Sequence, residues 1–225
     1  AVPANNNIQA FDIVIAKADL NVIADPQSIT FGQSIPALTF TYNNADFVNG
    51  DTDAVIDLAP SIATTATTGS NVGSYPITLS GGSDDNYNLL FTNASLEITQ
   101  ASQSITFNDP ADRTYGDPTF DLVTSATSGL AVAFNIISGP ASLSGNTVTI
   151  LGAGTVLVEA SQSGNVNFAA AIPVQQSFDV AKAALNVIAD PQSIAFGQSI
   201  PVLTFAYNNA DFVNGDTDAV IDLAP

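Results

Sequence analysis

Short runs in which apolar and polar residues alternate recur along the whole chain. They include LNVIAD, ALTFTY, YPITLS, ASLEITQ, NTVTILG, TVLVEAS and QSFDVAK. These runs are rich in β-branched and aromatic residues and are bounded by Gly, Pro, Asn or Asp, which is typical of half-buried strands joined by turns. No stretch shows a helical period with helix caps. The pattern predicts an all-β protein made of small β-sandwich modules.

The phase of this alternation also predicts which side chains form the core. With no cysteine available for disulfides, the modules must be stabilised by burial of apolar surface. The side chains expected to face inward are Ile29, Phe31, Leu38, Phe40, Val55 and Ile77.

A long internal repeat organises the chain. Residues 18–60 match residues 183–225 at an offset of 165, and the copies differ at only four of 43 positions. The acidic stretch YNNADFVNGDTDAVID stands unchanged at 42–57 and at 207–222. A shorter echo, in which QSI precedes an aromatic-Gly pair, recurs around Gly32, Gly116 and Gly197. The spacings indicate two unlike modules in each period.

Composition excludes several classes of function. The 225 residues hold 3 cationic and 21 acidic side chains, for a net charge of −18, which would repel phosphate backbones and anionic membrane surfaces. The absence of Cys and His excludes thiolate and imidazole metal sites and the usual nucleophilic triads. No apolar run is long enough to span a membrane. We therefore expect no nucleic-acid partner, no membrane insertion in this segment and no enzymatic activity.

Two families resemble parts of the chain. FGQSIPALTFTYNNADFVNGDTDAVIDLAP, followed by VGSYPITLS and by NYNLLF, resembles the MBG domain of the YGX type, a tandem module of very large bacterial surface proteins. Phe31 stands where that family opens with tyrosine. The segment between the two copies is similar to a bacterial immunoglobulin-like domain that alternates with MBG modules in adhesion proteins. The resemblance implies an elongated string with a terminal immunoglobulin-like strand at 1–17, an MBG module at 18–101, an immunoglobulin-like module at 102–182 and half of a second MBG module at 183–225.

The resemblance also implies a function. A segment of this kind is expected to be a non-catalytic stalk or spacer of a large secreted adhesin or extracellular filament on the bacterial cell surface, with neighbouring modules of the same chain as its partners. A glycan- or ice-binding module is the alternative. Because both ends are expected to be fragments of modules, either the molecule continues past them or strands are exchanged with other copies of the chain.

Calcium is the only cofactor for which the sequence offers candidate ligands. Asp51 and Asp53 stand in one loop directly after Gly50, and Asp109, Asp112 and Asp117 crowd the start of the middle module, where a shared ion could stiffen a junction. The simpler interpretation is that Asn49-Gly50 forms a tight turn and that the carboxylates bond nearby amides or solvate the loops. Two carboxylates on one turn are poorly placed to attack a glycosidic bond from opposite faces, so no catalytic residue is expected.

Overall fold

The computed structural model describes residues 12–222 and confirms the all-β prediction. The chain divides into two compact units, of which the first ends at Ala101 and the second begins at Ser102. Helical residues in the described part are confined to four single turns of 3-10 helix. The elements of unit 1 are β1 (Ala18–Ala24), β2 (Gln27–Thr30), β3 (Phe40–Tyr42), η1 (Asn44–Asp46), η2 (Asp53–Val55), β4 (Ser61–Thr64), β5 (Gly73–Ser80), β6 (Tyr87–Thr92) and β7 (Ala94–Thr99).

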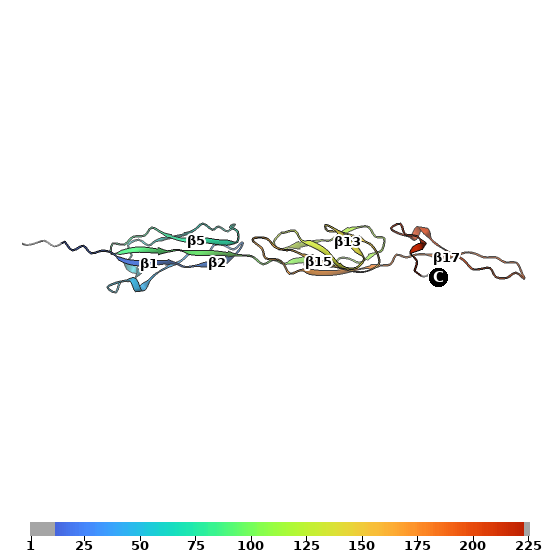
Figure 1. Cartoon of the computed structure of the whole chain (residues 1–225), viewed down its shortest axis with the longest axis horizontal. Coiled ribbons are helices and arrows are strands. Elements are labelled where there is room, and N and C mark those ends of the chain that lie inside the picture. Colours follow the sequence, from blue (N-terminus) through green and yellow to red (C-terminus); the bar gives the residue numbers. More distant parts are fainter. Residues whose placement is uncertain (1–11, 223–225) are drawn as a thin grey trace, which may run out of the picture. The chain divides into compact units, whose positions relative to one another are not determined.

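Unit 1 consists of two sheets, in the strand orders β3-β1-β6 and β2-β7-β5-β4. Figure 1 shows β1 and β2 following one another along one side of the unit, with β5 along the other. Two strand pairs run parallel: β1 pairs with β6 over six residues, and β2 pairs with β7 over four. Both pairs therefore pass together from one sheet to the other.

The core of unit 1 lies between these sheets. Alternate residues of β1 and β7 point inward, and Val22, Ile77 and Leu96 are fully buried. The predicted core residues Ile29, Phe31, Leu38 and Phe40 are partly buried and pack against this core. Ile77 is at its centre, as predicted.

The prediction for Val55 is wrong. Val55 is 39% exposed, because it ends the 3-10 turn η2 instead of lying in a strand. In a turn of this kind successive side chains do not alternate between two faces, so a strand period extended through AVIDL assigns the wrong side to this residue.

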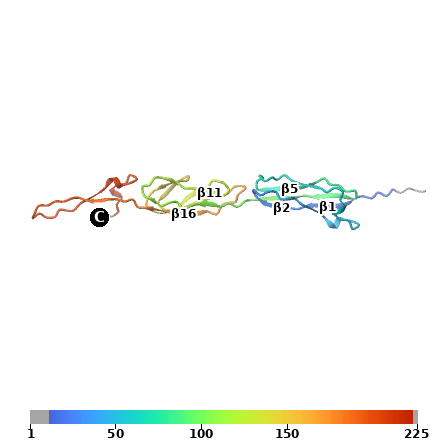
Figure 2. The same cartoon turned by 180° about the vertical axis from the view of Figure 1, so that it is seen from behind.

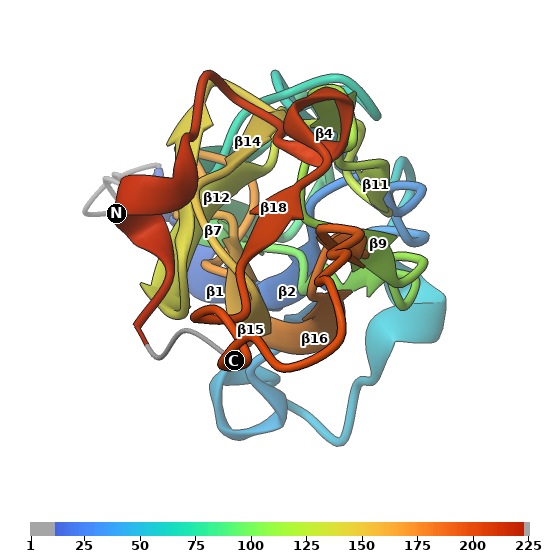
Figure 3. The same ribbon diagram turned by 90° about the vertical axis from the view of Figure 1, so that its right-hand side faces the viewer.

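Unit 2 holds the other elements. They are β8 (Ile105–Phe107), β9 (Arg113–Thr114), β10 (Phe120–Asp121), β11 (Thr124–Ala126), β12 (Ala133–Ser138), β13 (Ala141–Ser144), β14 (Thr147–Ile150), β15 (Gly154–Ser161), β16 (Val174–Ala181), β17 (Val187–Ala189), β18 (Phe205–Tyr207), η3 (Asn209–Asp211) and η4 (Asp218–Val220). The main sheet has the order β12-β15-β16-β9, and β10-β14-β13 forms a second sheet. In the end-on view of Figure 3, β12, β15, β16 and β9 follow one another around one side.

The core of unit 2 is formed by side chains between residues 105 and 180. Val148, Val156, Val158 and Phe178 are almost completely buried in it, and the ring of Phe120 meets that of Phe178 edge to face, with ring centres 5.4 Å apart. Parallel pairing occurs here too, between β9 and β16, but it extends over two residues only. Figure 2 shows β16 and β11 of this part from behind.

The second copy of the repeat folds only in part. β17 and β18 pair in the register of β1 and β3, since Val187 faces Tyr207 as Val22 faces Tyr42. Residues 192–195, which repeat β2, form no strand. Most apolar side chains of this copy are exposed, including Phe196, Ile200 and Leu203.

The described part of the expected segment 1–17 begins at residue 12. Residues 12–17 lie outside any strand, and Ile13, Val14 and Ile15 are exposed. The remainder of that segment lies outside the described residues.

Candidate functional site

The acidic stretch 42–57 folds into a compact set of turns. The Asp51 amide donates to the Val48 carbonyl over 3.0 Å, with Asn49 at φ 57° and Gly50 at φ 81°. Positive φ at both central positions defines the turn type that Asn-Gly favours. The turn predicted at Asn49-Gly50 is therefore confirmed.

Asp46 fastens this stretch to β1. One oxygen of its carboxylate accepts from the Asn21 amide at 3.0 Å and from Asn21 Nδ2 at 2.9 Å, and the other accepts from Asn43 Nδ2 at 3.0 Å. These hydrogen bonds, chiefly that from the Asn21 backbone, hold the pKa of Asp46 below its ordinary value. Asp46 was not among the predicted site residues, although Asp and Asn three positions apart are typical of a local side-chain bond.

Tyr87 from β6 closes the turn from the other side. Its hydroxyl donates to Asp51 Oδ2 at 2.9 Å and accepts from the Val48 amide at 2.9 Å, while its ring meets Phe47 edge to face. Burial, together with the Asp51 carboxylate, raises the pKa of Tyr87. The Asp51 carboxylate therefore accepts a hydrogen bond from a buried tyrosine of its own unit. The Asn-Tyr pair of the family pattern was the available signal for Tyr87.

Asp53 has a different surrounding. It begins η2, and its exposed carboxylate lies near enough to Tyr42 to add to the effect of burial in raising the pKa of that hydroxyl. The Tyr42 oxygen is buried and has no hydrogen-bond partner among the described residues. Together with Phe40 and Ile56, Tyr42 and Asp53 line a shallow pocket that the second copy repeats at Phe205, Tyr207, Asp218 and Ile221.

The three candidate carboxylates of the middle module have separate neighbours. Asp112 Oδ1 accepts from the Asp179 amide at 2.8 Å, Asp117 Oδ2 accepts from the Thr114 amide at 2.9 Å, and Asp109 lines a pocket with Arg113. Arg113 itself stacks over the Phe120 ring, with its guanidinium carbon 4.4 Å from the ring centre. Between residues 12 and 222 no three acidic side chains come together as a set of metal ligands. Calcium binding at these positions stays a prediction.

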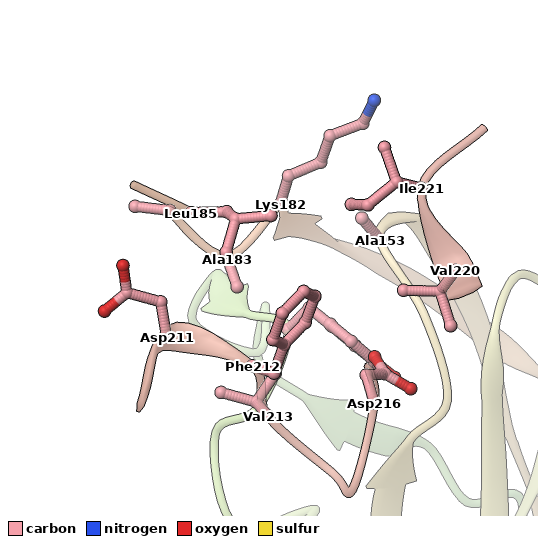
Figure 4. Close-up of a pocket in the computed structure, with 12 residues that line it drawn as sticks. Ala153, Lys182, Ala183, Leu185, Asp211, Phe212, Val213, Asp216, Val220 and Ile221 are labelled. Carbon is pink, nitrogen blue, oxygen red and sulfur yellow. The ribbon is translucent and has the colours of Figure 1, made fainter. Parts of the chain in front are cut away.

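In the second copy, the residue that corresponds to Asp51 has another partner. Asp216 Oδ2 accepts from the hydroxyl of Tyr115, which belongs to the middle module, over 3.0 Å. The two residues border a pocket of about 200 Å³ that is lined mainly by apolar side chains. Figure 4 shows the Phe212 ring in this pocket below Ala183, with Val220 and Ile221 to the right and the Lys182 side chain extending away.

The fold consists of two compact all-β units in which polar residues mainly secure turns. Comparison with known proteins adds a family for the first of them. Residues 20–97 match the family described as MBG domain (YGX type). No curated protein matches the chain.

Solved structures of immunoglobulin-domain proteins also match. One of them is described as the crystal structure of Dscam1 isoform 4.44, N-terminal four Ig domains, and it is 12% identical with a TM-score of 0.30. The match covers 84% of this chain and 60% of that structure. No helix in the described part is long and apolar enough to cross a membrane.

Proposed function

We propose that this chain is a non-catalytic stalk segment of a large secreted adhesin or filament at the bacterial cell surface, and that its modules act as spacers that carry tension. The match of residues 20–97 to a domain family that the sequence resemblance connects with bacterial surface proteins supports this proposal. The low count of cations and the engagement of the acidic residues in turns agree with a role that needs no ligand.

The strongest support for the proposal is the parallel pairing of β1 with β6 and of β2 with β7 in unit 1. The chain enters the module on β1 and β2 and leaves it on β6 and β7, and these strands are hydrogen-bonded neighbours over six and four residue pairs. Tension between the two ends of the module pulls these strands past one another. All hydrogen bonds of the ladder are then loaded together, whereas a hairpin pulled from its open end loses its bonds one at a time. Such an arrangement resists extension.

Single-molecule force spectroscopy on the full chain, held by its two ends, tests the proposal. We expect unit 1 to unfold in one event at a higher force than the middle module, whose β9 and β16 pair over two residues only. Leu96→Ala, in the core under β7, identifies the event by lowering its force. Unfolding of unit 1 at a force no higher than that of the middle module would contradict a tension-bearing role. Saturable binding of a glycan or of ice by the same chain would instead favour a binding module.

A further inference from the structure

Most polar side chains of the acidic stretch 42–57 are held by hydrogen bonds inside unit 1. They are Asn43, Asp46, Asp51, Thr52 and Asp57. Three others, Tyr42, Asn44 and Asp53, have no hydrogen-bond partner for their side chains among residues 12–222. Asn49 has none either, but it supplies the positive φ of the turn. The stretch therefore presents three polar groups that the fold of unit 1 does not use.

All three of these side chains line one pocket of unit 1, which has a volume of about 570 Å³. Ligand pockets usually measure about 300 to 1,000 Å³, so the space suits a side chain or a small molecule. The apolar part of the wall comes from Phe40, Ile56 and Ala59. The rings of Phe40 and Tyr42 meet edge to face, with centres 5.6 Å apart. Both sheets of unit 1 are formed, and the pocket remains open.

The charge of this pocket is negative. Asp53 is exposed, and its carboxylate lies near enough to Tyr42 to add to the effect of burial in raising the pKa of that hydroxyl. No Lys or Arg lines the pocket. The chain carries a net charge of −18, which raises the local concentration of cations at its surface. A ligand with hydrogen-bond donors and a positive charge therefore fits the groups that the fold leaves unused.

The second copy of the repeat forms the same arrangement. The residues equivalent to the lining of the pocket surround a pocket again, at Phe205, Tyr207, Asn209, Asp218 and Ile221. The Tyr207 hydroxyl is likewise buried and has no partner in the described part of the chain. Of the residues that line the pocket of unit 1, only Thr41 is replaced, by Ala206. The local sequence therefore determines the pocket.

We infer that the pocket of Tyr42, Asn44 and Asp53 binds the ammonium group of a lysine side chain that a partner protein presents. An ammonium group has three donors and no acceptor, so it can bond the Asp53 carboxylate and the carbonyl oxygen of the Asn44 amide together. The aromatic rings attract the same charge, and the apolar wall fits the methylene stem of lysine. This binding site is independent of the spacer role and adds to it.

A blocked Gly-Lys-Gly peptide is the probe, titrated into the isotope-labelled full chain and followed by NMR. Salt at about 0.15 M screens exposed charges beyond roughly 8 Å, so that attraction by the whole chain is suppressed. We expect saturable shifts of the amide signals of Asn44 and Ala54 in unit 1. A peptide with norleucine in place of lysine has the same stem without the charge. It should bind at least about ten-fold more weakly, because the hydrogen bond to a charged carboxylate is lost.

Variants of the chain complete the test. Asp53→Asn should weaken binding of the lysine peptide in unit 1 at least about ten-fold, because the charged acceptor is lost. Asp85→Asn is the matched control, since it removes the same charge from an exposed side chain of unit 1 that does not line the pocket. It should change the affinity by less than about two-fold in screening salt.

The norleucine peptide leaves the folding of the protein untouched, so the inference does not depend on the stability of the variants. Absence of saturable shifts would overturn the inference, and so would equal affinity of the two peptides. Equal weakening by Asp53→Asn and Asp85→Asn would show that only the general charge of the surface attracts lysine. Shifts of the same amide signals with a neutral sugar, and none with the lysine peptide, would assign the pocket to a glycan instead.

Discussion

Replacing one valine in each copy of the repeat measures what the covering strands contribute. Val22 lies fully buried in the core of unit 1, and Val187 occupies the same register position opposite a tyrosine but is 45% exposed. Val22→Ala removes two methyl groups from a filled interior. At about 0.8 kcal/mol for each buried carbon, with a further term for the cavity, the expected loss is about 2 to 3 kcal/mol of the free energy of unfolding of unit 1.

The same substitution at Val187 is the matched control. Its side chain has no closed core around it, so we expect a change below about 0.5 kcal/mol. For a module of this size, the loss at Val22 corresponds to a fall in melting temperature of about 10 to 20 °C. Urea titration with hydrogen exchange read separately in β6 and β7 assigns the change to unit 1. Equal losses at the two positions, or a loss below about 1 kcal/mol at Val22, would refute the view that β4 to β7 create the core around an otherwise uncovered first half.

Three further predictions concern the acidic side chains and their partners. Because the pKa of Asp46 is lowered in the folded protein, its carboxylate adds stability that is complete above the ordinary carboxyl range and is lost as the pH falls through the native pKa. The urea midpoints of the wild type and of Asp46→Asn should therefore converge in acid and separate toward neutral pH. Midpoints that change in parallel with pH would contradict this. Tyr87→Phe should lower the urea midpoint of unit 1 more than Tyr75→Phe does. The buried Tyr87 hydroxyl bonds the Asp51 carboxylate and the Val48 amide, whereas the Tyr75 hydroxyl bonds an exposed carbonyl. Equal midpoints of the two variants would show that the bonds of Tyr87 do not contribute to the stability of unit 1. If calcium binds in the middle module, the melting temperature of that module should rise in millimolar calcium and fall again when a chelator is added. Changing Asp109, Asp112 and Asp117 together to Asn should abolish the rise. A melting temperature that calcium does not change would leave these carboxylates as turn and solubility residues.

The sequence predicts the fold class well because strand period and turn chemistry are local properties. Asn49-Gly50 and its equivalent Asn214-Gly215 form the same turn, and the inward direction of the Ile77 side chain follows from alternation alone. The burial of Val55 was predicted wrongly because a single 3-10 turn interrupts the alternation, and no Gly or Pro within this turn indicates the interruption. Residues 27–30 form a strand in unit 1, whereas their equivalents at 192–195 form none, since strand β2 exists through its pairing with β7. Such a difference cannot be read from the segment itself.

The candidate site was less predictable than the fold. The role of Asp51 depends on Tyr87, which stands 36 residues away on another strand. Composition and spacing identify Asp51 as a turn carboxylate, but they do not indicate the direction of its side chain or the donor that it meets. In the second copy an identical turn meets Tyr115 instead, so the partner is decided by tertiary surroundings and not by the turn.

The parallel pairing of β1 with β6 also sets the order in which a module of this kind can fold during synthesis. Ala18 pairs with Tyr87, so the first strand emerges from the ribosome 69 residues ahead of its neighbour. At about 5 to 20 residues per second, it waits roughly 3 to 14 seconds for that neighbour. The β1–β3 pair can form at once, because Val22 and Tyr42 are only 20 residues apart, but its apolar face remains open until β6 and β7 arrive. Until then, each newly made first half exposes the apolar side chains of β1 and β3 that the later strands of the module cover.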